Sequence, residues 1–381
     1  MTGKERVAAI FEGKVPDKPP IMHISFSSRI AGRILGREAY VGGGIQQWRE
    51  AAALWKGPDA HTEFLERTRK DALDIAIACG HDMVRPSYWR DNRKPAKKID
   101  DLTYRYESPD GSWEVKQFDE PNELYNTIEH SPRKEVTFED LEAEVEKFEA
   151  AAEAHCPTEK DFGDLTYAQE KAGDKMAIRA SGPWTNIPPE EPAWLEAALL
   201  APELVGRYLD AQAKQSIKNI EVVAKMGLKY LFGGGDFASN QGPMYSPRVF
   251  HDLMLPRLKK VSRECHKRGA YHLFGSDGNV WAVAKDLYGA SGVDGHYEFD
   301  TRAGMDHVEV HAKYPKLVMV GNIASFTLHT GTPQDVEDEV KKMLDEARKT
   351  NKVITGCSNI IISETPMKNV DAMLKAIAKY R

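Results

Sequence analysis

Three carboxylate side chains follow short runs of apolar and glycine residues in the second half of the chain. They are Asp236, Asp277 and Glu298. A carboxyl group can donate a proton, accept one or help to hold a metal ion, so all three are candidate catalytic residues. We expect Asp236 to act as an acid or a metal ligand, and Asp277 and Glu298 to orient the groups beside it. For Asp277, a role as the N-cap of a helix predicted over 279–288 stays open.

One histidine and one cysteine occupy similar positions. His272 lies near the end of a predicted strand, where an imidazole can be a metal ligand, a general acid or a buried structural residue. Cys357 follows the last predicted strand, where a thiol can be a metal ligand, a nucleophile or an inert buried side chain. Both join the candidate set, and a structural role stays open for each.

Small, polar and aromatic residues stand at the other predicted strand ends. We predict that the substrate is bound by Ser25, Trp89, Trp184, Phe274 and Asn322. Flat tryptophan and phenylalanine rings suit an aromatic substrate. The alternative is that these residues only form turns and caps.

A repeating pattern of short strand, loop and helix places all these residues. Strands are predicted over 21–26, 82–88, 176–180, 229–232, 270–274, 293–297, 316–320 and 352–355. Helices are predicted over 193–226, 246–267, 279–288, 304–312, 333–349 and 367–379. Such alternation indicates parallel strands, and the lack of a Gly-x-Gly-x-x-Gly fingerprint favours an α/β fold of the (β/α)8 barrel type. In such a barrel the loops after the strands form the active site.

Two features decorate the predicted barrel. Residues 103–118 alternate around a Pro-Asp-Gly turn, which predicts an inserted β-hairpin, and extra helices precede the barrel at the N-terminal side. No linker rich in proline, glycine or serine interrupts the chain, so residues 1–381 are predicted to form one domain.

Composition narrows the class of protein. The formal net charge is −6 and the basic residues are dispersed, so nucleic acid is not an expected partner. No segment has the length and apolar character of a membrane span, and the N-terminal residues read as an amphipathic helix, not a secretory signal. The four cysteines form no CxxC pair. We therefore expect a cytoplasmic protein without a membrane partner.

Several motifs resemble the uroporphyrinogen-decarboxylase superfamily. The opening stretch 5–21 resembles the E-R-x-x-A-x-x-x-G start of these proteins, and 275–279 resembles their S-D-G-N/D loop. Further matches lie at 235–236, 242–247, 321–323, 331–336 and 356–369. The resemblance implies a (β/α)8 barrel and, as the superfamily expectation, a homodimer.

The decarboxylase branch of the superfamily is matched poorly. Its arginine-rich motif is only partly present at 29–33, and its catalytic aspartate corresponds to 85–88, where no acid stands. Its tyrosine is missing from 183–189, and its final histidine is replaced within 356–358. The chain instead resembles the branch of corrinoid-dependent methyltransferases, and within it the methyl-donor subunits of aryl-ether O-demethylases.

The same resemblance implies a zinc site. Thiol-methylating relatives bind zinc through an H-x-C pair and a later cysteine; here His272 and Cys357 match, but Phe274 replaces the middle thiolate. Asp236, His251 and His272 share the spacing of the two acids and the histidine that bind zinc in some aryl-ether demethylases, with a histidine in place of the second acid. The implied ligands are Asp236, His251, His272 and Cys357.

These observations lead to one functional hypothesis. The protein moves a methyl group from a small donor, most readily a methoxylated aromatic compound, to the Co(I) corrinoid of a partner protein. Because a phenolate is a poor leaving group, an acid or Lewis acid must stand beside its oxygen. The alternatives are a donor such as methanol, methylamine or a methylthiol, a uroporphyrinogen decarboxylase, and a binding protein without catalysis.

Overall fold

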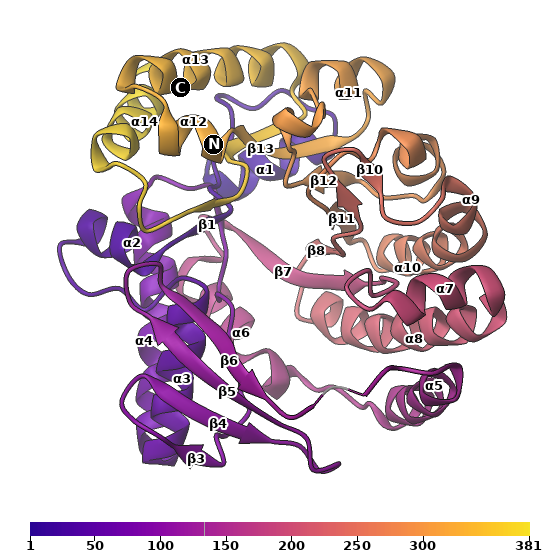
Figure 1. The fold of residues 1–381 in the computed structure, drawn as a ribbon. Coiled ribbons are helices and arrows are strands. Elements are labelled where there is room, and N and C mark those ends of the chain that lie inside the picture. The colour runs from indigo at the N-terminus through magenta and orange to yellow at the C-terminus, as the bar shows by residue number, and fades with distance from the viewer. Residues whose placement is uncertain (133) are drawn as a thin grey trace.

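The computed structural model describes residues 1–132 and 134–381, and its centre is a ring of parallel strands (Figure 1). Seven strands hydrogen-bond in the order β14-β13-β12-β11-β8-β7-β2. Their bounds are β2 (Met83–Val84), β7 (Ala177–Trp184), β8 (Tyr230–Gly234), β11 (Tyr271–Gly275), β12 (Gly295–Tyr297), β13 (Val318–Ile323) and β14 (Val353–Cys357). Each neighbouring pair is parallel, as the alternating pattern predicts.

The eighth position of the ring belongs to the chain segment that leads into β1 (Ser25–Phe26). On one side, the Met22 N–H donates to the Thr355 carbonyl of β14, and the Thr355 N–H donates to the Pro20 carbonyl. On the other side, the Asp82 N–H donates to the Ile21 carbonyl. These hydrogen bonds close the seven strands into a barrel, which confirms the predicted fold class.

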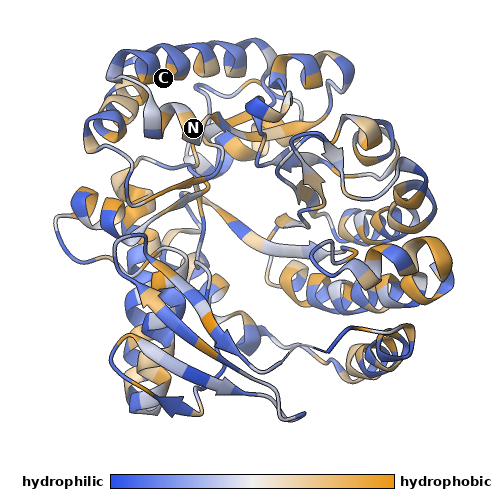
Figure 2. Cartoon of the chain, viewed as in Figure 1, coloured by the Kyte–Doolittle hydropathy of each residue, from blue (hydrophilic) through white to orange (hydrophobic). Residues whose placement is uncertain are grey.

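Helices surround the barrel and separate its strands along the chain. They are α1 (Gly3–Phe11), α2 (Ser28–Leu35), α3 (Gly44–Lys56), α4 (Pro58–Ala78), α5 (Phe138–Ala154), α6 (Gly163–Ala172), α7 (Pro192–Leu200), α8 (Pro202–Lys225), α9 (Pro247–Val249), α10 (Leu255–Lys267), α11 (His307–Lys313), α12 (Ser325–Thr330), α13 (Pro333–Thr350) and α14 (Met367–Tyr380). The helix α13, for example, turns its apolar side inward: it buries Val336, Val340 and Leu344 and leaves its other side hydrophilic (Figure 2). No described helix has the length and apolar character needed to cross a membrane.

Strand alternation separates two sets of apolar side chains. Phe232, Leu273, Tyr297 and Val320 belong to a cluster inside the barrel. Phe274, one residue beyond Leu273, instead belongs to the cluster between the barrel and its helices. Since successive side chains of a strand point to opposite faces, this register decides which residues can reach the barrel mouth.

The predicted hairpin is part of a larger antiparallel sheet. Its four strands are β3 (Lys97–Lys98), β4 (Thr103–Glu107), β5 (Trp113–Asp119) and β6 (Leu124–His130), paired in chain order. The sheet lies beside α3 and α4, away from the ring of strands (Figure 1). Many outward side chains of β6 are exposed and polar, which hides the apolar alternation that the prediction relied on.

Three predicted helices differ from the observed ones because of local backbone chemistry. The segment 193–226, predicted as one helix, forms two helices, because Pro202 begins α8 and lacks the N–H that would continue α7. The segment 246–267, predicted as one regular helix, contains a π-helical turn, Phe250–Met254, just before Pro256. The segment 279–288, predicted as one helix, forms a 3₁₀ turn, Trp281–Val283, followed by a π-helical turn, Lys285–Ala290.

Candidate active site

Three adjacent strands deliver three carboxylates to one point at the barrel mouth. Asp236 follows β8, Asp277 follows β11, and Glu298 follows β12. One oxygen of each side chain lies within 4.8 Å of an oxygen of the other two. Because the carboxyl ends of parallel neighbours meet at the same rim, the barrel brings together the three predicted acids.

The acids are linked to each other and to the last strand loop. The Asp277 N–H donates to Asp236 Oδ1 at 3.1 Å, and Asn359 Nδ2 donates to Asp277 Oδ2 at 2.8 Å. Asp277 is therefore not the N-cap of the following turn; Asn359 holds its side chain, and Asn279 accepts from the Trp281 N–H instead.

The electrostatics of the cluster favour a retained proton. Burial, together with the charges of Asp236 and Asp300, raises the pKa of Asp277 to about 6. Burial and the charge of Asp277 raise the pKa of Glu298 to about 7. A carboxyl with a pKa in this range is protonated often enough near neutral pH to act as a general acid.

Two residues at the mouth have a strained backbone. Glu298 has φ 69° and Asn322, on the adjacent β13, has φ 87°. This left-handed region is costly for residues other than glycine and is found where function holds a residue in place. Asn322 shares the inward parity of Val318 and Val320, it is buried, and both polar atoms of its amide have no protein partner in the described chain. The amide is therefore available to a ligand.

Two arginines, which the sequence analysis did not single out, line the same end of the barrel. Arg85 follows β2 and lies over the Trp89 ring, with Cζ 4.2 Å from the ring centroid. Arg179, within β7, lies over Phe232 and Tyr297 at 4.7 Å and 5.1 Å. In the sequence, Arg179 could have been found as a cation within the mostly apolar and small residues of a buried strand. In the structure its position faces the interior of the barrel.

The predicted rim residues are spread around the mouth. Ser25 is buried with no protein partner for its hydroxyl among the described residues, whereas Trp89 and Trp184 are 41% and 56% exposed. A pocket of about 280 Å³ opens beside Asp277 and is lined by Phe299, Arg302, Phe326 and Asn359 among others. The mouth therefore combines an open apolar rim with a charged interior.

His272 and Phe274 lie on the other face of their strand. His272 Nδ1 is 2.8 Å from the Ser262 hydroxyl of α10, and burial lowers the pKa of this histidine to about 3. Phe274 packs against Phe237 in the helix layer. The intervening Leu273 faces the barrel interior, so the strand register turns both predicted residues away from the three acids.

The zinc ligands implied by the sequence are not brought together. His251 is exposed on the π-helical turn and pairs with Asp286 at 2.9 Å. Cys357 is buried in an apolar cluster, and burial raises the pKa of its thiol to about 12. Of the four residues, the acidic cluster includes Asp236 alone, and that cluster offers only oxygen donors. The residues at the mouth do not fit the predicted nitrogen- and sulfur-containing zinc site.

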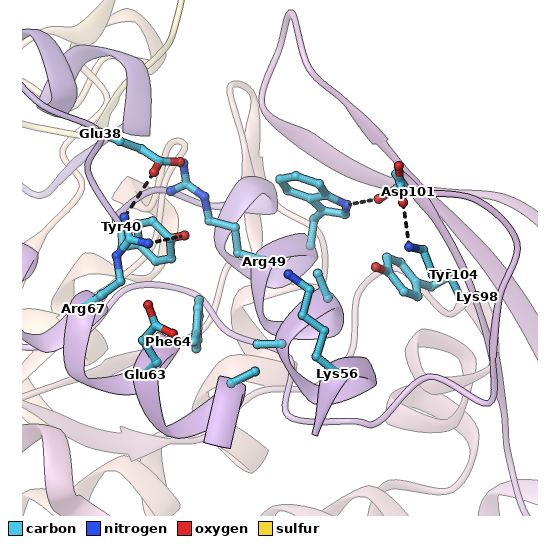
Figure 3. Close-up of a pocket in the computed structure, with 14 residues that line it drawn as sticks. Glu38, Tyr40, Arg49, Lys56, Glu63, Phe64, Arg67, Lys98, Asp101 and Tyr104 are labelled. Atoms are coloured by element: carbon cyan, nitrogen blue, oxygen red, sulfur yellow. Dashed lines mark hydrogen bonds and ion pairs between the residues drawn. The ribbon is translucent and has the colours of Figure 1, made fainter. Parts of the chain in front are cut away.

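A second pocket, of about 400 Å³, lies between α3, α4 and the antiparallel sheet (Figure 3). Its two arginines, Arg49 and Arg67, stack on the Tyr40 ring and bind opposite oxygens of Glu38 at 2.9 Å and 3.1 Å (Figure 3). Since these cations already have a carboxylate partner, we assign them a structural role and place the candidate site at the barrel mouth.

Comparison with known proteins identifies the family of this chain. A family model described as uroporphyrinogen decarboxylase (URO-D) matches residues 190–380, just over half of the chain. The chain belongs to the uroporphyrinogen decarboxylase family. A solved structure described as a methyltransferase from Methanosarcina mazei aligns with 100% of this family member and 99% of that chain, with a TM-score of 0.59 and 19% identity. That likeness shows a shared fold.

Two curated relatives are named methylcobamide:CoM methyltransferase MtbA. One is from Methanosarcina acetivorans and one from Methanosarcina mazei; each is 25% identical, over 203 and 193 residues respectively. The alignments cover 50% of this chain and 53% of each relative, so the chain spans about half the length of the relatives it matches. These names point to the methyltransferase branch that the sequence motifs resemble.

Proposed function

We propose that this protein transfers a methyl group from a methoxylated aromatic compound to the Co(I) corrinoid of a partner protein. The observation that carries the proposal is the cluster of Asp236, Asp277 and Glu298 at the mouth of a barrel shared with a methyltransferase. The names of the curated relatives support methyl transfer, and the tryptophans at the rim support an aromatic donor.

Glu298 is the acid in this proposal. Breaking the bond between a methyl carbon and an aryl oxygen leaves a phenolate, which is a poor leaving group unless its oxygen receives a proton. A large fraction of Glu298 is protonated near neutral pH, because burial and Asp277 raise its pKa to about 7. Its strained backbone holds the carboxyl at the mouth, and Asp277 is fixed beside it by Asn359. The products are the phenol, which gains the proton of Glu298, and the transferred methyl group.

Other residues of the chain position the donor. The amide of Asn322, which has no partner among the described residues, can hydrogen-bond a substituent of the ring, and Trp89 and Trp184 offer flat surfaces at the entrance. A bound corrinoid would supply the Co(I) nucleophile that accepts the methyl group. The rim suits a docked partner because exposed apolar side chains stand at or beyond the ends of several strands: Trp89, Trp184, Met244, Phe326 and Ile362.

Methylation of a thiol, the chemistry of the thiol-methylating branch that the sequence also resembles in part, has less support here. Zinc sites that activate a thiol use soft donors, and the two candidates, His272 and Cys357, both lie outside the barrel interior. Decarboxylation of a tetrapyrrole also has less support, since the pocket of about 280 Å³ is at the small end for ligand sites.

The test is a panel of methyl donors mixed with the protein and a reduced corrinoid protein. The proposal predicts that methoxylated aromatics change the visible spectrum of the corrinoid and release one phenol per methyl group, while methanol, methylamine and a methylthiol do not. Release of carbon dioxide from uroporphyrinogen without any corrinoid would contradict the proposal.

A further inference from the structure

We infer that Arg85 and Arg179 form an anion-binding subsite, and that the methyl donor is an aromatic carboxylate. This inference rests on the proposed function, because it names the class of donor used at that site. It starts from two cations at the barrel mouth for which residues 1–132 and 134–381 supply no carboxylate partner.

The contacts of Arg85 leave its charge unpaired. Its Nε donates to the Ser87 carbonyl at 2.9 Å and its Nη1 to the Ile24 carbonyl at 3.2 Å. Beneath the guanidinium lie the rings of Tyr88 and Trp89. Within the described part of the chain, no carboxylate lies within ion-pair distance of Arg85, unlike the surface arginines that pair with acids.

Arg179 is even less satisfied. Its guanidinium lies over the neighbouring inward rings of Phe232 and Tyr297, and its Nη1 is buried with no hydrogen-bond partner among the described residues. A buried guanidinium nitrogen without an acceptor is costly, because it loses its hydrogen bonds to water and gains none in exchange. Such a group is retained where a ligand supplies the missing acceptor.

The two arginines act on each other. Burial first, and then the nearby charge of Arg179, lower the pKa of Arg85 to about 9. Two like charges near each other repel, and an anion bound between them removes the repulsion and accepts hydrogen bonds from the open donors. The planar fork of a guanidinium matches a carboxylate in particular, because the two oxygens accept two parallel hydrogen bonds.

The acids and the arginines belong to consecutive strands of the barrel, from β2 to β12. Arg179 lies over the Tyr297 ring, and Glu298 is the next residue of that strand end. The charges of both arginines act on Glu298, yet neither forms an ion pair with it. The mouth therefore has a cationic pole and an acidic pole. A donor with a carboxylate at one end of its ring and a methoxy group at the other satisfies both poles and places the ether oxygen at Glu298.

Binding without any corrinoid tests the subsite. The probes are a methoxybenzoate and the matching methoxybenzyl alcohol, titrated calorimetrically into the full-length protein. We expect the wild type to bind the carboxylate about 10- to 100-fold more tightly, the range for hydrogen bonds to charged groups. Arg179→Met should abolish this preference and leave the affinity for the alcohol unchanged, whereas Arg179→Lys should keep part of it.

Arg263→Met is the matched control, because Arg263 is exposed on α10; its preference should equal that of the wild type. Equal binding of the two probes by the wild type, or no binding of the carboxylate, would overturn the inference. A preference that survives Arg179→Met in a folded protein would do the same. If Arg179→Met does not fold, the partial loss in Arg179→Lys decides.

The failures of the two proposals are distinguishable. If the carboxylate preference depends on Arg179 but no donor methylates the corrinoid, the proposed function fails and the anion subsite stands. If the alcohol donates its methyl group as well as the carboxylate does, the anion subsite fails and the proposed function stands.

Discussion

Replacing Glu298 with glutamine changes the stability of the protein in a pH-dependent way. The pKa of this carboxyl rises from 4.5 to about 7 on folding, first because of burial and then because of Asp277. Between these values the folded protein holds a proton that the unfolded chain has released. The stabilising contribution of Glu298 is therefore complete below pH 4.5 and is lost as the pH rises through about 7.

The magnitude follows from the difference between the two pKa values. It corresponds to about 3 kcal/mol of ionisation cost in the folded protein at pH 8. We reduce this to about 1–2 kcal/mol, because the side chain keeps some contact with solvent at the mouth. Glutamine has nearly the same shape and no charge, so Glu298→Gln should raise the free energy of unfolding by about 1–2 kcal/mol at pH 8. Near pH 4.5 it should change little.

Urea unfolding followed by circular dichroism at the two pH values measures both numbers. Glu309→Gln is the control, because this glutamate is 53% exposed on α11 and forms a surface ion pair with Lys313. Its effect should stay within about 0.5 kcal/mol at both pH values. A Glu298→Gln variant that is less stable than the wild type at pH 8, or equally stabilised at both pH values, would refute the electrostatic description of the mouth.

Three more outcomes concern the chemistry. Asp277→Asn removes a charge that helps to raise the pKa of Glu298. The rate should therefore fall with rising pH at a lower pH than in the wild type, whose midpoint we expect near pH 7. An unchanged midpoint would contradict the coupling between the two carboxyl groups. His272→Ala should keep methyl transfer within about threefold and lower the unfolding free energy by about 1–3 kcal/mol, because only its bond to Ser262 and its packing are lost; a loss of rate without a loss of stability would place the histidine in the reaction. Dialysis against a chelator should leave the rate unchanged; a loss restored by zinc or magnesium would show that the acids hold a metal ion instead of a proton.

The barrel was predictable because its signals are local. Each strand and helix shows in a run of a few residues, and the rule that sites form after the strands then placed Asp236, Asp277 and Glu298 together. The helix break at Pro202 is also a local signal, but apolar residues at helical spacing on both sides of it led to the prediction of one continuous helix.

The orientation of side chains was not predictable from the same signals. A shift of one residue in strand register turns His272 outward and Leu273 inward, and an apolar strand flanked by helices looks the same in either register. Arg179 was missed for the same reason, because its meaning depends on the interior of the barrel. The left-handed backbone of Glu298 has no sequence signature, since glutamate rarely adopts it.

The most direct test of the central claim, that Glu298 protonates the leaving oxygen, compares wild type and Glu298→Gln on a series of methoxylated benzoates whose phenols differ in acidity. An acid catalyst matters most when the leaving phenolate is most basic. We predict that the variant loses about 100- to 1,000-fold in rate with the least acidic phenol and little with a nitro-substituted one. The same loss for every donor, or no loss for any, would contradict the account.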